Sequence, residues 1–318
     1  MDISVIGCGR WGSFIAWYLD SIHHNVSLYG RETSKNMQQF IETRKNDYLT
    51  LNDTIKLETS LDHLKTVDII VISINSQGLQ ALFDELNSMN LKNKIFVLCM
   101  KGIEITTLRR LSDICKDNVD SSNKIAVWLG PGHVEDFTKG YPNCMVIDSE
   151  DKPTIDLLIK EFSSELIRFY YGKDLIGNEI GAASKNVYGI AAGMLDGLNL
   201  TSLKGALMSR GTREIARLIK KMGGNELSAY GLCHLGDYEA TVFSKHSHNR
   251  GFGEAYVKGE KFDKLAEGYY TTKALKLLSE KYKIELPIND AIYNILYLDK
   301  NPQSELKKLF QRSLKDEY

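Results

Sequence analysis

The feature of this sequence that most constrains its fold lies within the first twelve residues. A β-branched apolar run, residues 3–6, leads directly into Gly7-x-Gly9-x-x-Gly12, and a helix-length apolar segment, Ser13–Leu19, follows. Gly7 permits a tight turn, Gly9 has no Cβ and lets the backbone approach a pyrophosphate, and Gly12 lets the helix lie close to the strand. The free N–H groups at the start of such a helix attract an anion. The pattern therefore predicts a strand–turn–helix that binds a dinucleotide.

Further apolar runs predict the rest of a sheet. They are short, rich in valine and isoleucine, and mostly separated by segments long enough for crossover helices. This alternation is typical of buried parallel strands in a doubly wound sheet. The expected strands are Asn25–Tyr29, Asp68–Ser73, Lys94–Cys99, Ile125–Leu129, Asn143–Ile147 and Ile167–Tyr171.

After Asp174 the apolar pattern changes to the period of a helix. The expected helices are Ile180–Leu195, which is small and apolar almost throughout, and the amphipathic segments Leu203–Met222, Glu267–Tyr282 and Ile288–Tyr297. We therefore expect an α/β protein with an N-terminal Rossmann-type doubly wound sheet and an all-α C-terminal domain. The dinucleotide-binding domain would span residues 1–172, and the helical substrate and catalytic domain residues 173–318.

Composition and charge argue against several classes of function. The chain has 318 residues, 43% of them hydrophobic, which is enough material for two cores. A net charge of −1 gives no field that would attract nucleic acid. No apolar stretch reaches the roughly eighteen residues of a membrane span, and the apolar start lacks the basic region of a signal peptide. The five cysteines form no CxxC pair, which predicts reduced thiols in a cytoplasmic protein without a zinc site.

The residues after the second expected strand bear on the choice of coenzyme. That strand is followed by Gly30, Arg31 and Glu32. An arginine here can stack on adenine or face a 2′-phosphate, whereas an acid can hold the ribose 2′-hydroxyl. A solvated Arg–Glu pair is the alternative. We expect NADP(H) to be accepted, with NAD(H) also allowed.

One lysine interrupts the apolar helix expected at Ile180–Leu195. Lys185 stands among small residues, and Asn186 beside it offers a donor and acceptors. Lysine is rarely buried without a partner, and burial favours its neutral form, so a buried lysine can exchange a proton near neutral pH. The alternative is a lysine that extends its amine to the end of the helix.

Three further polar segments are candidates for the same site. Asp237 follows a glycine-rich turn and could partner Lys185, although a helix-capping role is the simpler interpretation. The segment Ser247–Gly253 is polar and rich in glycine, as expected either for ligand contacts or for an exposed loop. Lys101 follows the strand Lys94–Cys99, and the carboxyl end of a strand is where an open α/β sheet binds ligands.

In this order, these motifs resemble the soluble NAD(P)-dependent glycerol-3-phosphate dehydrogenases over residues 1–298. Single motifs of this kind are weak, but eight in register are specific. The matching segments are Gly7–Gly12, Lys101–Glu104, Gly130–Asp136, Gly181–Val187, Arg210–Glu214, Gly231–Asp237, Glu267–Gly268 and Leu286–Ile288.

The resemblance implies a role for each candidate residue. Lys185 would be the proton donor and acceptor, with Lys101 and Asp237 also catalytic. The implied substrate-binding residues are Lys101, Asn186, Asp237, Ser247, His248 and Asn249. The implied coenzyme-binding residues are Gly7, Gly9, Arg10, Trp11, Gly12, Arg31, Lys101, Val134, His248 and Glu267. The implied reaction is hydride transfer from NAD(P)H to dihydroxyacetone phosphate, and the implied assembly is a homodimer.

Three departures from the family pattern fall on the substrate side. His248 replaces an arginine, Gly132 replaces a serine or threonine, and the segment ending at Leu203 replaces Gly-Asp-Asn. Histidine has fewer donors than arginine and is mostly neutral at pH 7. A related dehydrogenase that acts on a different small polyol or ketose phosphate is therefore the second hypothesis. A coenzyme-binding regulator without catalysis is the third, and a buried proton donor argues against it.

Overall fold

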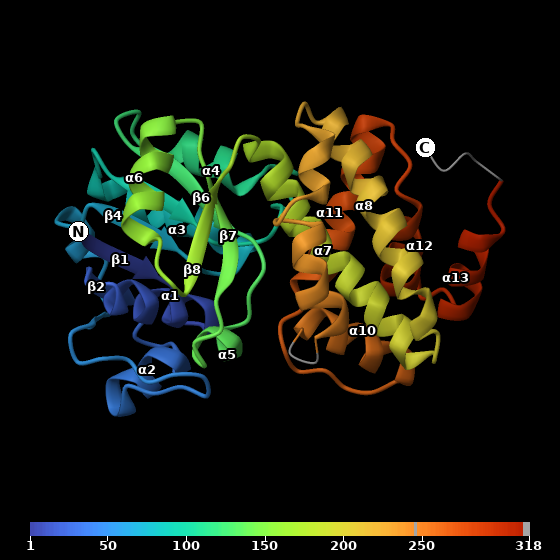
Figure 1. The fold of residues 1–318 in the computed structure, drawn as a ribbon, viewed down its shortest axis with the longest axis horizontal. Helices are drawn as coiled ribbons and strands as arrows, with labels where there is room; N and C mark the ends of the chain where they lie inside the picture. The colour runs from blue at the N-terminus through green and yellow to red at the C-terminus, as the bar shows by residue number, and fades with distance from the viewer. Residues whose placement is uncertain (245–246, 314–318) are drawn as a thin grey trace. The chain divides into compact units, whose positions relative to one another are not determined.

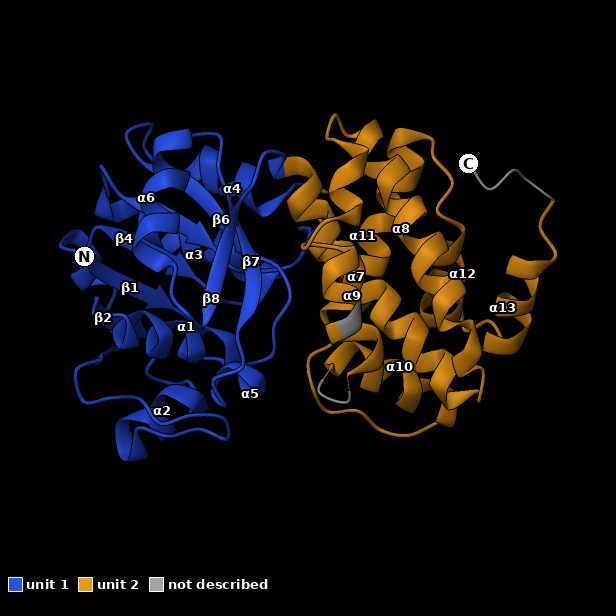
Figure 2. Cartoon of the chain, in the orientation of Figure 1, with its two compact units in different colours: residues 1–104, 109–175 blue, residues 105–108, 176–318 orange. Residues whose placement is uncertain are grey.

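The computed structural model describes residues 1–244 and 247–313, except for the side chain of Glu239. The chain forms two compact units (Figure 2). Unit 1 comprises Met1–Glu104 and Arg109–Leu175, and unit 2 comprises Ile105–Leu108 and the chain from Ile176 onward.

Unit 1 is built on one sheet, which has eight strands among the described residues, in the order β3-β2-β1-β4-β5-β6-β7-β8 (Figure 1). The strands are β1 (Asp2–Ile6), β2 (Asn25–Tyr29), β3 (Lys56–Glu58), β4 (Ile69–Ile72), β5 (Ile95–Leu98), β6 (Lys124–Leu129), β7 (Asn143–Asp148) and β8 (Ile167–Tyr171). The predicted strands are all present. The three-residue strand β3 is too short to have given a sequence signal.

One prediction about the sheet is wrong: β7, expected to be parallel to its neighbours, is antiparallel to β6. The reason lies in the connection between them. Residues 130–142 hold only the four-residue helix α5 (Val134–Phe137), which spans about 6 Å. So short a helix does not carry the chain back along the strands, so β7 starts at the edge where β6 ends. The pairs from β3 to β6 are parallel, as is β7 with β8.

Helices cover both faces of the sheet. They are α1 (Arg10–Ser21), α2 (Lys35–Thr43), α3 (Leu79–Leu86), α4 (Leu111–Asn118) and α6 (Lys152–Phe162), with 3-10 turns at Asp62–Lys65, Ser76–Gly78 and Asn87–Met89. On one face Tyr18 of α1 and Phe162 of α6 pack against Trp128 of β6. On the other face Phe83 of α3 meets Phe96 of β5.

Unit 2 is helical and is organised around one long buried helix, α7 (Leu175–Gly197). The other helices are α8 (Lys204–Lys221), α9 (Leu235–Tyr238), α10 (His248–Lys258), α11 (Glu267–Tyr282), α12 (Pro287–Leu298) and α13 (Pro302–Phe310), with 3-10 turns at Thr201–Leu203 and Glu226–Tyr230 and a π-helical turn, η6, at Glu239–Phe243. The Rossmann-type sheet and the helical second half are confirmed. None of the helices in the described ranges has the length and apolar character needed to cross a membrane.

Glycines let α10 lie directly against α7. A Cβ on Gly193 would overlap the carbonyl of Arg250, and one on Gly253 would overlap the carbonyl of Ile190. Backbone rather than flexible side chain is the obstacle at both positions, so the neighbouring helix itself would have to move.

We predict that Gly253→Ala lowers the free energy of unfolding by about 1–3 kcal/mol, because the methyl group forces α10 away from α7. Gly205→Ala is the matched control. Gly205 is exposed on α8, and a methyl group added there would have no neighbouring atom within 4 Å. Its replacement should change the free energy of unfolding by less than about 0.5 kcal/mol, as is usual for exposed positions away from packed contacts. Urea denaturation measures both, and equal effects would contradict the packing argument.

Candidate functional site

The glycine turn between β1 and α1 has the geometry of a phosphate-binding turn. Gly7 has φ +113°, and a Cβ there would overlap the carbonyl of Ser73. A Cβ on Gly12 would overlap the carbonyl of Gly7. Gly9, at the N-cap of α1, has nothing within 4 Å of a Cβ position. The helix N-terminus is thus open toward a pyrophosphate, and this chain fits a dinucleotide coenzyme.

Two side chains of the turn are fixed by aromatic and charged neighbours. The Arg10 guanidinium lies 5.4 Å from the centre of the Tyr48 ring and 3.4 Å from a carboxylate oxygen of Glu135. Trp11 packs against Phe14 and Phe137, with ring centres 5.1 and 6.2 Å away. The Trp11 Nε1–H is buried and finds no acceptor within the described part of the chain.

Other predicted coenzyme residues follow the carboxyl ends of neighbouring strands. Lys101, after β5, donates from Nζ to the carbonyl of Gly130 at 2.6 Å. Val134 is fully buried at the start of α5. Arg31, after β2, forms an ion pair with Glu85 of α3 at 2.6 Å. These residues and the glycine turn share the edge of the sheet at which an open α/β sheet binds its ligand.

The structure supplies a reason for the departure at Gly132. This residue has φ +153°, and its Cβ would lie 2.7 Å from Cζ of Phe137. The Phe137 ring is itself stacked on Phe14, with centres 4.9 Å apart. A serine at position 132 does not fit while this ring is present.

In unit 2 the predicted lysine is buried in an ion pair. Lys185 of α7 is 8% exposed and Asp237 of α9 is 1% exposed. The Lys185 Nζ lies 2.8 Å from Asp237 Oδ2 and donates to Thr241 Oγ1 at 2.8 Å. Thr241 in turn donates to the Asp237 carbonyl at 2.8 Å. The amine is therefore held at two points and does not extend to the helix end.

Asn186 belongs to a second chain of hydrogen bonds. Its Oδ1 accepts from Asn249 Nδ2 at 3.0 Å, and Asn249 Oδ1 accepts from the Gly268 N–H at 2.9 Å. A Cβ on Gly268 would come within 2.5 Å of the Asn186 carbonyl oxygen, so the start of α11 touches α7 directly. These bonds orient both asparagine amides.

The remaining predicted residues lie at helix starts. Ser247 is the N-cap of α10, and its hydroxyl accepts from the Arg250 N–H. His248 is the first residue of α10, and Glu267 is the first residue of α11. Lys185, Asn186, Asp237, Ser247, His248, Asn249 and Glu267 thus all belong to the helical unit. The predicted residues Gly7–Gly12, Arg31, Lys101 and Val134 belong to unit 1.

Sequence reasoning missed Thr241, although a signal was present. Thr241 lies four residues after Asp237, the spacing that puts two side chains on one helix face. It also missed His234, which is fully buried and close enough to Lys185 and Asp237 to feel their charges. The His234 Nδ1 bonds the Gly181 carbonyl at 2.8 Å, and Nε2 bonds the Tyr238 hydroxyl at 3.1 Å. Burial lowers the His234 pKa to about 4, so this ring is neutral at pH 7.

A buried carboxylate, Glu214 of α8, completes the polar interior of unit 2. Its oxygens accept from the Ile288 N–H at 2.9 Å and the Asn289 N–H at 3.0 Å, at the start of α12. The Tyr188 hydroxyl also donates to it at 3.2 Å. Burial raises the Glu214 pKa to about 7, against these three hydrogen bonds, which favour the ionised form.

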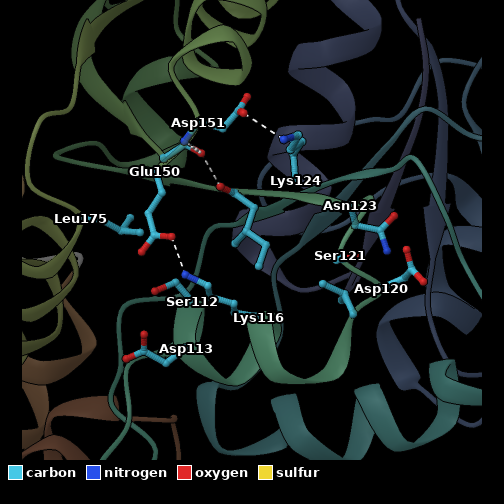
Figure 3. Close-up of a pocket in the computed structure, with 13 residues that line it drawn as sticks. Ser112, Asp113, Lys116, Asp120, Ser121, Asn123, Lys124, Glu150, Asp151 and Leu175 are labelled. Atoms are coloured by element: carbon cyan, nitrogen blue, oxygen red, sulfur yellow. Dashed lines mark hydrogen bonds and ion pairs between the residues drawn. The ribbon is translucent and has the colours of Figure 1, made fainter.

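A pocket of about 500 Å³ lies elsewhere in unit 1 (Figure 3). It is near Lys124, the first residue of β6, and so at the sheet edge opposite to the glycine turn. Two ion pairs occupy its rim: Lys116 with Glu150 at 2.6 Å, and Lys124 with Asp151 at 2.9 Å. None of the catalytic, substrate-binding or coenzyme-binding residues predicted from the sequence lines this pocket.

The doubly wound sheet, the open glycine turn and the buried Lys185 define a two-unit dinucleotide-dependent oxidoreductase. Models of the N-terminal and C-terminal parts of NAD-dependent glycerol-3-phosphate dehydrogenase match residues 2–155 and 174–307, respectively. The chain belongs to the NAD-dependent glycerol-3-phosphate dehydrogenase family.

Relatives match along the whole chain. The glycerol-3-phosphate dehydrogenase [NAD(P)+] of Thermoanaerobacter sp. (strain X514) is 34% identical over 100% of this chain and 99% of its own. The protein of the same name from Fusobacterium nucleatum is 33% identical, over 99% and 98%. The crystal structure of glycerol-3-phosphate dehydrogenase from Coxiella burnetii superposes with a TM-score of 0.91, at 27% identity, over 98% of this chain and 99% of that one.

We predict that Glu214→Gln changes how stability depends on pH. A carboxyl group with a raised pKa stabilises the fold fully below pH 4.5 and loses that contribution as the pH rises through 7. Between pH 5 and pH 8 the wild type should lose up to roughly 3 kcal/mol of unfolding free energy relative to Glu214→Gln.

Denaturant titrations at several pH values measure this difference, with Glu254→Gln as the control. The Glu254 pKa is lowered, chiefly by its hydrogen bond with Lys258, so its ionisation does not change in this range. If the unfolding free energy of the wild type, relative to that of Glu214→Gln, stays constant or rises with pH, the carboxylate stays ionised in this range.

Proposed function

We propose that this chain reduces dihydroxyacetone phosphate to sn-glycerol 3-phosphate with NAD(P)H, and that Lys185 donates the proton. Family membership supports the reaction, and the buried Lys185–Asp237–Thr241 group supports the role of the lysine. When bound, the coenzyme supplies a hydride to the central carbonyl carbon of the substrate. Negative charge then grows on the carbonyl oxygen, and a positioned ammonium can neutralise it by proton transfer.

The fixed position of the amine is the observation that carries this proposal. Asp237 and Thr241 occupy two directions around Lys185 Nζ at 2.8 Å each, which restricts where the amine can point. Holding a donor in one geometry lowers the entropy lost on reaching the transition state. Lys101 is the proposed second cation at the reacting oxygen, where it would stabilise developing charge.

The substrate side is assigned to unit 2. Asn186 and Asn249 present oriented amides, and Ser247 and His248 start the helix that carries Asn249. A helix N-terminus and a histidine can bind a phosphate, but with fewer charged donors than an arginine would supply. Because His248 departs from the family pattern, another small polyol or ketose phosphate is the second candidate substrate.

We also propose a cytoplasmic location, a homodimer and the division at residue 172 between coenzyme and substrate domains. Five free cysteines, four of them buried, support a reducing compartment. The family resemblance and the apolar helical half support the dimer. Sedimentation of the purified protein tests the assembly directly.

We predict that Lys185→Ala lowers kcat by about 10²- to 10⁴-fold, because the proton donor is lost. Coenzyme binding, followed by quenching of tryptophan fluorescence, should persist because the glycine turn is untouched. The measurement is the loss of nicotinamide absorbance with dihydroxyacetone phosphate as substrate.

The control separates catalysis from stability. Lys204 is a second buried lysine of unit 2, paired with Asp196 at 2.7 Å. Lys204→Met should destabilise the fold, because Asp196 and the buried Val242 carbonyl each lose a hydrogen-bond donor, but it should lower kcat by less than tenfold. Full activity of Lys185→Ala would refute the catalytic assignment.

We predict that His248→Arg lowers KM for dihydroxyacetone phosphate by about tenfold, because a guanidinium bonds a phosphate with charge-assisted donors. Dihydroxyacetone, which lacks the phosphate, is the matched substrate and should show no change. A panel of ketose phosphates tested alongside identifies the preferred substrate. An unchanged or higher KM for every phosphorylated substrate would mean that this position does not face the phosphate.

A further inference from the structure

The carboxylate of Glu85 has no role in the proposed reaction, yet it occupies a distinctive place in unit 1. Arg31 directly follows Gly30, and a Cβ on Gly30 would lie 2.5 Å from Cys8 Sγ in the glycine turn. Arg31 therefore starts next to the turn assigned to the pyrophosphate. In Rossmann-type sites this position distinguishes a ribose 2′-hydroxyl from a 2′-phosphate.

Glu85 reaches this position from the other side of β1. Helix α3 follows β4, and β1 lies between β2 and β4 in the sheet. The ion pair between Arg31 Nη2 and Glu85 Oε1, 2.6 Å long, thus links the end of β2 to α3 across the strand that carries the glycine turn. The Tyr29 phenol lies near both charges: burial chiefly raises its pKa, Glu85 raises it further and Arg31 lowers it.

The pair is held loosely enough to be exchanged. The Arg31 side chain is 65% exposed and the Glu85 side chain 43% exposed. Ion pairs this exposed contribute little to stability, because water screens the attraction and two flexible side chains must be ordered. A backbone bond from the Ser34 N–H to the Arg31 carbonyl, 2.8 Å long, fixes the start of the side chain but not its end. The guanidinium is free to change partner.

We infer that Glu85 sets the preference between the two coenzymes by competing for Arg31. The 2′-phosphate of NADPH would have to take the guanidinium from Glu85 and would then lie near a like charge. The 2′-hydroxyl of NADH is uncharged and meets neither cost. Glu85 is thus a specificity-determining residue that disfavours NADPH while leaving NADH unaffected. This inference rests on the proposed coenzyme site at the glycine turn.

The test is Glu85→Gln in the full chain, with dissociation constants for NADPH and NADH measured by tryptophan quenching and by coenzyme fluorescence. Glutamine keeps the size and removes the charge. We expect the Kd for NADPH to fall roughly five- to tenfold, as removal of a unit charge near a dianion predicts, and the Kd for NADH to change by less than twofold.

Asp84→Asn is the matched control. Asp84 lies next to Glu85 on α3, and its carboxylate accepts from Gln80 Nε2 at 2.9 Å rather than from Arg31. This variant makes the same change in net charge one residue away and should leave the ratio of the two constants within twofold of wild type. If the ratio shifts equally in both variants, the effect comes from net charge rather than from the position of Glu85, and the inference is overturned.

Two further outcomes separate this inference from the function on which it rests. If the wild type binds both coenzymes and Glu85→Gln leaves their ratio unchanged, the role of Glu85 is wrong and the coenzyme site stands. If the wild type binds neither coenzyme, the proposed site itself fails. Adding Arg31→Leu to Glu85→Gln should abolish the gain for NADPH, and persistence of the gain would show that Glu85 does not act through Arg31.

Discussion

The buried ion pair between Lys185 and Asp237 is the interaction on which the helical unit depends. Removing two charges from water costs several kcal/mol for each ion. The attraction offsets that cost only when hydrogen bonds satisfy the remaining donors and acceptors of the pair. Thr241 supplies one such bond to the amine. The segment from α9 through the π-helical turn η6 must therefore pack against α7 at the level of Lys185. Gly181 and Gly189 leave room for that packing, since a Cβ on either would press against His234 or Thr241.

The π-helical turn positions Thr241 relative to the ion pair. A π turn holds one more residue than an α-helical turn and often marks a functional site. Here η6 spans Glu239–Phe243 and places the Thr241 hydroxyl between the Asp237 carbonyl and the Lys185 amine. The neutral His234 ring adds bulk and two hydrogen bonds without adding charge. The amine is thereby bounded by an anion and a hydroxyl.

Much of this could be read from the sequence, because the strongest signals are local. Continuous valine and isoleucine runs predicted the strands, and Gly7, Gly9 and Gly12 predicted the turn. Lys185 was conspicuous as a charge within an apolar helix. The direction of β7 could not be predicted, because it depends on the length of α5, and a four-residue helix has little periodicity to detect.

Contacts between distant segments were also beyond a reading of local pattern. Glu85 looks like any surface carboxylate on α3 until the fold brings it within 2.6 Å of Arg31. Glu214 looks like one acid in a charged amphipathic helix, but its partners are the N–H groups of Ile288 and Asn289, more than seventy residues away. Pairings of this kind arise from the tertiary fold and leave no trace in spacing.

The contact between Gly132 and the Phe137 ring has an evolutionary consequence. The two positions are coupled, so the effect of a side chain at one depends on the occupant of the other. A chain in which the ring is already packed against Phe14 and Trp11 does not accept a side chain at position 132 by a single substitution. The ring must shrink first, and that intermediate leaves a cavity in the core. The order of the two substitutions then decides whether position 132 can carry a side chain at all.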